Sequence, residues 1–281
     1  MASLLALLSS GFWGSADYHA GNLSKRFPAI AVLALTQAIG FITGITLVVI
    51  SHSWNATALG SHGYLIPGIL AGLFGYVGLM SLYSGLSTGR MGVVSPISSL
   101  GALIPLAYAI FVRGDHLSTI LTIGVAIALL GGFLASGPEF SQGVPLRPLL
   151  FALSAAFFFG AALVCMAIGS KSSALMTMTT MRATTFVIGI GLFIRFRNVG
   201  GLGRAQLPLL IYIGVADFAA NLLLGVATTK GLVSIAMVLG SLYPVVTALL
   251  AYLLLHERLH KLQYVGVFFA VTGVSIISAA S

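Results

Sequence analysis

The chain is a succession of long apolar runs, and most of its charge lies in the short connections between them. Of its 281 residues, 58% are hydrophobic and only 6% are charged, whereas a soluble domain carries roughly 25% charged residues. No soluble core absorbs such an excess of apolar surface, so we expect lipid to solvate it. The runs are too long and too uniformly apolar for the strands of a membrane barrel.

A spanning helix needs about 20 mostly apolar residues, and by this measure the runs predict about ten transmembrane helices in an all-α integral membrane protein. The predicted spans are 3–22, 28–50, 64–86, 92–112, 118–137, 147–169, 174–195, 206–229, 232–255 and 262–280.

Lysine and arginine in the short loops predict how the chain is oriented, because cytoplasmic loops carry an excess of both. One side collects Lys25, Arg26, Arg90, Arg147, Arg195, Arg197, Arg204, Arg258 and Lys261. The other side has Arg113, Lys171 and Lys230. We therefore expect the first set in the cytoplasm, the chain as a multi-pass protein of the cell (inner) membrane, and both termini on the outer, periplasmic side.

The sequence predicts an internal repeat, with residues 1–138 as a first five-helix half and 139–281 as a second half of one integrated domain. The matching positions are Gly14 with Gly160, Lys25 with Lys171, Gly44 with Gly189, Gly72 with Gly214, Gly124 with Gly266, and Gly131 with Gly273. An odd number of spans per half makes the second half enter the membrane from the opposite side. Such inverted repeats are common in secondary transporters. Chance likeness between apolar helices is the alternative.

Residues 240–278, GSLYPVVTALLAYLLLHERLHKLQYVGVFFAVTGVSIIS, resemble the C-terminal motif of EamA-type transporters of the drug/metabolite transporter superfamily. The features that match include Pro244, Glu257, Gly266 and Gly273. Within the superfamily, residues 233–251 look closest to YddG-like amino-acid exporters. The Arg113-Gly114-Asp115-His116 segment departs from the Gly-Glu-Arg-Leu loop usual in the family.

The resemblance implies ten helices around a central cavity, lined mainly by the first, third, fourth, sixth, eighth and ninth. It also implies export of amino acids, aromatic ones among them, and of related metabolites. The family has no universal site motif, so the candidate residues come from polar and aromatic positions in the spans. The substrate-binding candidates are Trp13, Asp17, Tyr76, Tyr83, Ser95, Ser99, Phe159, Arg182, Asp217, Asn221, Met237, Ser241 and Tyr243.

Charged residues inside spans are the most informative of these candidates, because an ionisable group at the helix centre costs about 2.5–3.5 kcal/mol on insertion scales. We expect Asp217 or Asp17 to meet a solute's ammonium or a proton, and Arg182 to meet a carboxylate. The alternative is an Asp217–Arg182 pair that only ties two helices together. For the small and polar positions, close helix packing is the corresponding alternative.

Two mid-span prolines, Pro105 and Pro244, predict moving parts. Each frees the carbonyl four residues earlier, which belongs to Gly101 or Gly240. Exposed backbone at membrane depth is tolerated only against protein or a wet cavity. We therefore expect the fourth and ninth spans to bend at the cavity and to act as gates, with a static kink as the alternative.

The sequence thus predicts a secondary transporter that exports amino acids and related small metabolites by alternating access. The alternatives are a transporter of nucleotide-sugars, purines or drug-like cations and, less favoured, a channel or a membrane-embedded enzyme. We expect no catalytic activity, cofactor or bound metal, because no P-loop, zinc motif or clustered acids are present. The expected partners are a small-molecule substrate and the lipid bilayer, without nucleic acid, and we expect a monomer.

Overall fold

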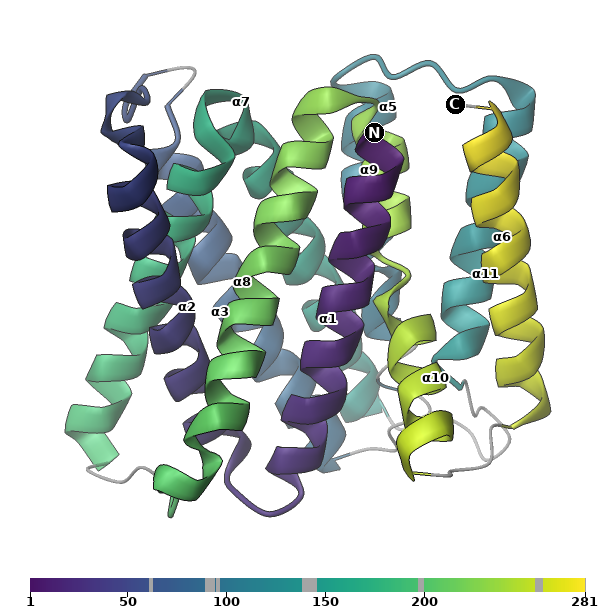
Figure 1. The fold of residues 1–281 in the computed structure, drawn as a ribbon. Helices are drawn as coiled ribbons and strands as arrows, with labels where there is room; N and C mark the ends of the chain where they lie inside the picture. Colours follow the sequence, from purple (N-terminus) through teal and green to yellow (C-terminus); the bar gives the residue numbers. More distant parts are fainter. Residues whose placement is uncertain are drawn as a thin grey trace.

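The structure of the chain, a computed structural model, describes residues 1–60, 63–88, 94, 97–137, 146–196, 200–255 and 260–280. Throughout this part the chain is helical and contains no strand (Figure 1). The main helices are α1 (Ala2–Ser24), α2 (Ala29–Ser51), α3 (Leu65–Thr88), α5 (Leu103–Phe111), α6 (Thr119–Ala135), α7 (Leu146–Phe196), α8 (Leu207–Lys230), α9 (Val233–Gly240), α10 (Tyr243–Leu255) and α11 (Lys261–Ala280). The short 3-10 helices are η1 (Ser53–Asn55), η2 (Leu100–Ala102) and η3 (Arg204–Gln206).

Six segments of the described chain are long and apolar enough to cross a membrane. They are Ala29–Ser51, Leu65–Leu82, Leu146–Ile194, Arg204–Lys230, Val233–Leu254 and Lys261–Ala280. Two shorter apolar helical segments cover Ile97–Phe111 and Thr119–Ala135. Helices suit such segments because all their backbone hydrogen bonds close within the segment, so no polar backbone group faces lipid. The chain is therefore a multi-pass membrane protein.

α7 is one continuous run in which the chain reverses direction at Ser173. The backbone of Ser173 is extended (φ −161°, ψ 116°), and its hydroxyl accepts a hydrogen bond from the Met176 amide at 3.2 Å, as an N-cap does. α7 therefore consists of two helical arms, 146–172 and 174–196, which cover the predicted spans 147–169 and 174–195.

Both chain termini lie at the same end of the bundle (Figure 1). We call this end the terminal face; it also holds the end of α2, the Ser173 joint and the turn between α8 and α9. The opposite face holds the turn between α1 and α2 and the starts of α8 and α11. Lys25, Arg26, Arg147, Arg204 and Lys261 belong to helix ends and turns of the opposite face, while Arg113, Lys171 and Lys230 belong to the terminal face. Arg90, Arg197 and Arg258 and the Arg195 side chain lie outside the described residues.

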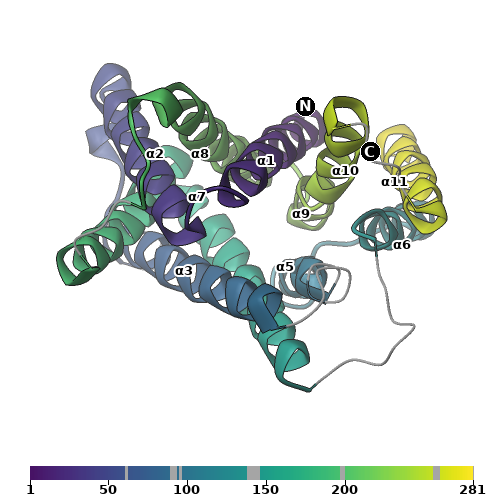
Figure 2. The same cartoon turned by 90° about the horizontal axis from the view of Figure 1, so that it is seen from below.

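Close packing through glycine joins the helices. α3 lies along α7, α6 along α11 and α1 along α8, and Figure 2 shows the α6–α11 pair at one side of the assembly. At Gly266 and Gly273 a Cβ atom would collide with the backbone of Ala135 and Ala128 on α6. Small residues allow this approach, which lets dispersion forces associate helices in lipid.

The fourth and ninth predicted spans are both interrupted near their middle. η2 (Leu100–Ala102) precedes α5, and α9 ends at Gly240 before α10 begins at Tyr243. Pro105 and Pro244 therefore lie in the first turn of a new helix, where a missing N–H costs no intrahelical bond. The interruptions fall where the two prolines predicted bends, but as breaks between helices rather than as kinks inside them.

Candidate functional site

A cavity of about 300 Å³ lies between the helices. Its walls come from α1, α2, α3, the η2 segment, both arms of α7, α8, α9 and the break before α10. Besides the helices that the family resemblance implied, α2 and the second arm of α7 contribute to the walls. The cavity thus draws on both halves of the chain.

Most of the predicted site residues line this one cavity. Those that do are Trp13, Asp17, Tyr76, Ser99, Phe159, Arg182, Asp217, Asn221, Met237, Ser241 and Tyr243, together with the predicted gate residue Gly101. Tyr83 belongs to α3, but its side chain lies outside the described part of the chain, as does all of Ser95. Pro105, Gly240 and Pro244 are buried and do not line the cavity.

The Asp217 carboxylate collects hydrogen bonds from several helices. At Oδ1 it accepts from the Trp13 indole N–H at 3.1 Å and from the Asn221 amide at 3.2 Å. At Oδ2 it accepts from the Gln37 amide at 3.4 Å and pairs with the Arg182 guanidinium at 2.7 Å. Since an ionised carboxylate has about four acceptor sites, the acceptor capacity of Asp217 is filled by protein donors.

Arg182 is almost completely buried, at 5% exposure. Its Nη1 donates to the Gln37 side-chain oxygen, which also accepts from the Thr185 hydroxyl at 3.1 Å. Its Nε is buried without a partner among the described residues and lies beside Gly40, whose missing side chain leaves room for the guanidinium stem. Gln37 thus bridges the acid and the base.

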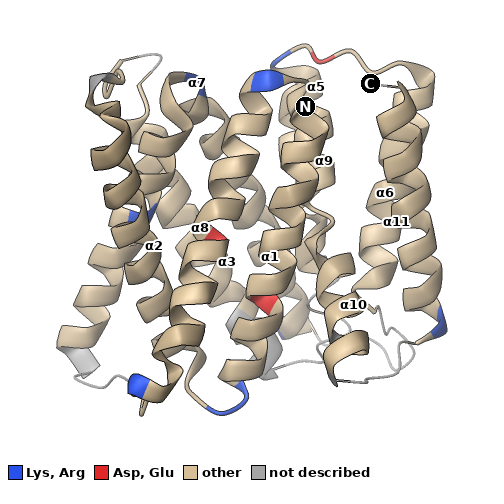
Figure 3. Ribbon diagram, in the orientation of Figure 1, with Lys and Arg blue, Asp and Glu red and all other residues tan. Residues whose placement is uncertain are grey.

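Asp17 is the other acid of the cavity, and its surroundings differ. It lies one turn after Trp13 on the same face of α1, and its side chain is exposed to the cavity. Among the described residues, no hydrogen bond or ion pair reaches its carboxylate. In Figure 3 the acidic positions of α1 and α8 both lie within the helices, away from their ends.

Aromatic and apolar side chains form the rest of the wall. Trp13 and Tyr243 meet edge to face, with ring centroids 6.1 Å apart. Phe159 packs over Gly78, where a Cβ atom would lie 2.7 Å from its ring. Tyr76 and Leu79 lie nearby on α3. The cavity thus combines a charged region with an apolar one, the usual composition of a small-molecule site.

The cavity reaches from the middle of the bundle toward the opposite face. Its lining on α2 stops at Gln37, early in a helix that begins at the opposite face, and on α1 it starts only at Trp13. On the terminal side the buried core closes it, with Val233, Ala236 and Leu239 fully covered. The loop before α6 contacts the start of α9 on this side: the Asp115 carboxylate accepts hydrogen bonds from the Ser234 amide and hydroxyl, both at 2.9 Å.

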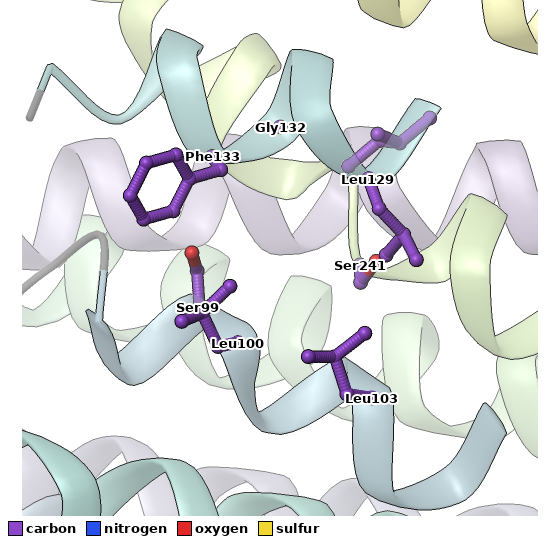
Figure 4. A pocket seen from close by; sticks show the side chains of 8 residues that line it. Ser99, Leu100, Leu103, Leu129, Gly132, Phe133 and Ser241 are labelled. Atoms are coloured by element: carbon purple, nitrogen blue, oxygen red, sulfur yellow. The ribbon is translucent and has the colours of Figure 1, made fainter. Parts of the chain in front are cut away.

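The helix breaks meet beside the cavity. Ser99 and Ser241 line both the cavity and a neighbouring space of about 20 Å³, bounded by Phe133 and other residues of α6 (Figure 4). The Gly101 carbonyl, four residues before Pro105, lies against Gly160 of α7. We expected this carbonyl to face either protein or a wet cavity. In the structure it packs against the protein, at Gly160.

Sequence reasoning missed Gln37, Thr185 and Met181, which line the cavity from α2 and α7. A signal for Gln37 existed. Counted from the matched Gly44 and Gly189, Gln37 occupies the position in the first half that Arg182 occupies in the second. Across the described residues, no group of three or more His, Cys, Asp or Glu is arranged to hold a metal ion.

Comparisons with known proteins agree with this picture. The model of the EamA-like transporter family matches residues 1–137 and again residues 146–279. An uncharacterised protein of Methanocaldococcus jannaschii is 25% identical over 136 residues, which are 48% of this chain and 96% of that protein. A crystal structure of a protein superimposes with a TM-score of 0.80 at 17% identity, covering 99% of this chain and 97% of the other. At that identity the likeness shows the fold alone.

Proposed function

Because this chain belongs to the EamA-like transporter family, we propose that it is a secondary transporter that exports amino acids and related small metabolites by alternating access. The family consists of membrane transporters of small substrates rather than enzymes. The finer assignment, to amino acids and to YddG-like exporters, is the part that we propose. The observation that carries it is the cavity of about 300 Å³, where acidic and polar side chains lie beside aromatic ones.

We also propose ten crossings. Splitting α7 at Ser173 divides one long apolar run into two arms, each long enough to cross the bilayer. Ile97–Phe111 and Thr119–Ala135 are shorter and also apolar. α1 has 23 residues and carries polar side chains that face the cavity, which lowers its hydropathy but not its length. Both termini then lie on the outer side, because the opposite face holds more of the basic residues.

The contacts between helices support an inverted repeat of 1–138 and 139–281. A Cβ atom at Gly131 would meet Ala270, and one at Gly273 would meet Ala128. In the predicted repeat, Gly273 corresponds to Gly131 and Ala270 corresponds to Ala128. The same contact therefore occurs twice, with the two halves exchanged. The family model also matches each half separately.

A second pair of contacts repeats in the same way. Gly72 of α3 packs against Thr184 of α7, and Gly214 of α8 packs against Ile39 of α2. Gly214 corresponds to Gly72 in the predicted repeat. Ile39 corresponds to Thr184, because the two residues lie at the same distance in sequence before the matched Gly44 and Gly189. Two halves related in this way can rock about a midplane site and expose it to either side in turn.

The test is transport by the purified protein in proteoliposomes. We expect saturable uptake of labelled phenylalanine or tryptophan and counterflow against the unlabelled solute, which a channel does not produce. Trp13→Phe removes the indole donor to Asp217, and we expect it to lower the flux by roughly tenfold, or about 1.4 kcal/mol.

The chain supplies a matched control in its other tryptophan. Trp54 is 56% exposed in η1, at the terminal face and outside the cavity, so Trp54→Phe should leave the flux unchanged. Equal losses in the two variants, or flux that never saturates, would contradict a carrier that works through this cavity.

A further inference from the structure

We propose that the cavity selects solutes of net positive charge, organic ammonium ions without a free carboxylate, and that Asp17 is the residue that receives the ammonium group. This inference rests on the proposed transport function and ranks its solutes: amines and carboxyl-blocked derivatives among the related metabolites are preferred over the amino acids themselves.

The first step is that Asp217 has no acceptor site left. Its two oxygens are occupied by Trp13, Asn221, Gln37 and Arg182, which come from α1, α8, α2 and α7. An incoming ammonium would have to displace one of these donors and leave it unpaired. A polar group left without a partner inside the protein is unfavourable, and a charged one more so.

The second step is that Arg182 is not available to a solute carboxylate. It is 5% exposed and is held from two sides, by Asp217 at 2.7 Å and by the Gln37 oxygen. A solute carboxylate that bound Arg182 would have to compete with Asp217, whose side chain is 25% exposed, and would leave that carboxylate without its counter-charge. Removing one partner of a largely buried ion pair is unfavourable, because the other charge then stays in the protein without compensation.

The third step is that Asp17 is free. Its side chain is exposed to the cavity and receives no hydrogen bond or ion pair from the described chain. Trp13, one turn earlier on α1, lines the same cavity, and its ring orientation is fixed by the bond to Asp217. A carboxylate beside an aromatic wall is a favourable setting for an organic cation.

The charge balance of the cavity points the same way. Arg182 and Asp217 neutralise each other, so ionised Asp17 leaves one uncompensated negative charge. A charge in a low-dielectric environment is costly unless it is paired. A monocation brings the occupied cavity to neutrality, whereas a zwitterion leaves its net charge unchanged and an anion doubles it.

The remaining wall suits an apolar or aromatic body on that cation. Tyr76, Leu79, Phe159 and Leu163 line the cavity from α3 and α7, and none of them carries a charge. An arylalkylamine could place its amine at Asp17 and its ring among these side chains.

The test compares four solutes that share a phenyl ring and differ in charge: phenethylamine, phenylalaninamide, phenylalanine and 3-phenylpropionate. Binding to the purified full chain in lipid nanodiscs is measured by calorimetry, with counterflow in proteoliposomes alongside. We expect the two cations to bind at least about tenfold more tightly than phenylalanine, and 3-phenylpropionate not to bind.

Variants assign the effect to Asp17. Asp17→Asn should weaken binding of both cations at least about tenfold, and Asp17→Glu, which keeps the charge, should restore much of it. Ser15→Ala is the matched control, because Ser15 lies on the same helix, bonds to Tyr212 and does not line the cavity. Its binding constants should equal those of the unmodified protein.

Phenylalanine binding as tightly as its amide, or Asp17→Asn binding the cations normally, would overturn the inference. Transport of phenylalanine in the same vesicles would then leave the proposed transport function standing. If a folded protein neither binds nor moves any solute of the series, the charge selection is wrong, and counterflow of other amino acids decides separately whether the chain is a carrier.

Discussion

Asp17 and Asp217 are the same residue type in one cavity, yet their environments assign them different work. Asp217 holds together α1, α2, α7 and α8 through its bonds to Trp13, Gln37 and Arg182. Asp17 contributes nothing comparable to the packing. At the residue scale, the stability of the bundle and the recognition of a solute are therefore separated onto two carboxylates.

The first prediction at this scale concerns stability. Asp217→Asn should lower the free energy of unfolding by about 3–5 kcal/mol, because it leaves the Arg182 guanidinium buried without its counter-charge. The measurement is thermal or denaturant unfolding of the detergent-solubilised protein. Asp17→Asn is the control and should leave the unfolding free energy nearly unchanged.

A double variant makes this prediction sharper. Asp217→Asn combined with Arg182→Gln removes both charges, so it should be more stable than Asp217→Asn alone. Additive losses in the double variant would show that the pair is not coupled.

At the scale of elements, the broken segments are the parts of the bundle best suited to move. η2 with α5, and α9 with α10, are short helical pieces joined end to end near the cavity. Ser99 directly precedes η2, Ser241 lies between α9 and α10, and both line the cavity. Separate short helices can change their angle without breaking a continuous ladder of backbone hydrogen bonds.

Pro244→Ala tests this mobility. Alanine restores an N–H that can bond to the Gly240 carbonyl, so α9 and α10 can join into a stiffer helix. We expect solute flux to fall severalfold while solute binding and thermal stability are retained. The measurements are counterflow and calorimetry on the same preparation.

Pro208→Ala is the control for that prediction. Pro208 also lies in the first turn of a helix, but at the start of α8 on the opposite face, away from the breaks. Its flux should be unchanged. If Pro244→Ala transports at the normal rate, the break between α9 and α10 is a fixed feature of the fold and not a gate.

Much of this element structure could be predicted from the sequence, because the length of an apolar run directly limits where a membrane helix begins and ends. The position of the breaks followed from Pro105 and Pro244. The predicted spans 147–169 and 174–195 separate the two arms of α7, but hydropathy could not predict that a single extended residue, Ser173, joins them and caps the second arm.

The site was predicted less completely than the helices. Polar stripes identified Asp17, Asp217 and Asn221. Hydropathy, however, does not show which face of a helix points toward the cavity. Gln37 was therefore missed on α2. Likewise, only the packed structure shows that the acceptor sites of Asp217 are filled by protein donors, whereas Asp17 accepts no hydrogen bond from the described residues.

At the scale of the whole molecule, the cavity is asymmetric. It extends toward the face that holds Lys25, Arg26, Arg204 and Lys261, and buried apolar side chains close it toward the chain termini. In the orientation that we propose, with the basic face in the cytoplasm, this structure is the state that loads a solute from inside the cell. The proposed export then requires the two halves to rock until the terminal face opens.

Labelling of intact cells tests this orientation. In a Cys165→Ala background, Ser51→Cys at the end of α2 should react with a membrane-impermeant maleimide. Ser24→Cys at the end of α1 should react only after the membrane is permeabilised, because it lies at the basic face. The reverse labelling pattern would show that the orientation is opposite to the proposed one. Labelling of both cysteines from outside would show that α1 and α2 do not end at opposite faces of the membrane.

The bond between Asp115 and the first turn of α9 bears on how fast such a molecule can work. It ties the loop before α6 to α9 at the terminal face. In the proposed transport cycle, opening toward this face has to break the hydrogen bonds between Asp115 and Ser234, and they form again when the empty protein closes. The turnover rate of the proposed cycle therefore depends on how often the Asp115 carboxylate separates from Ser234, although neither residue lines the cavity.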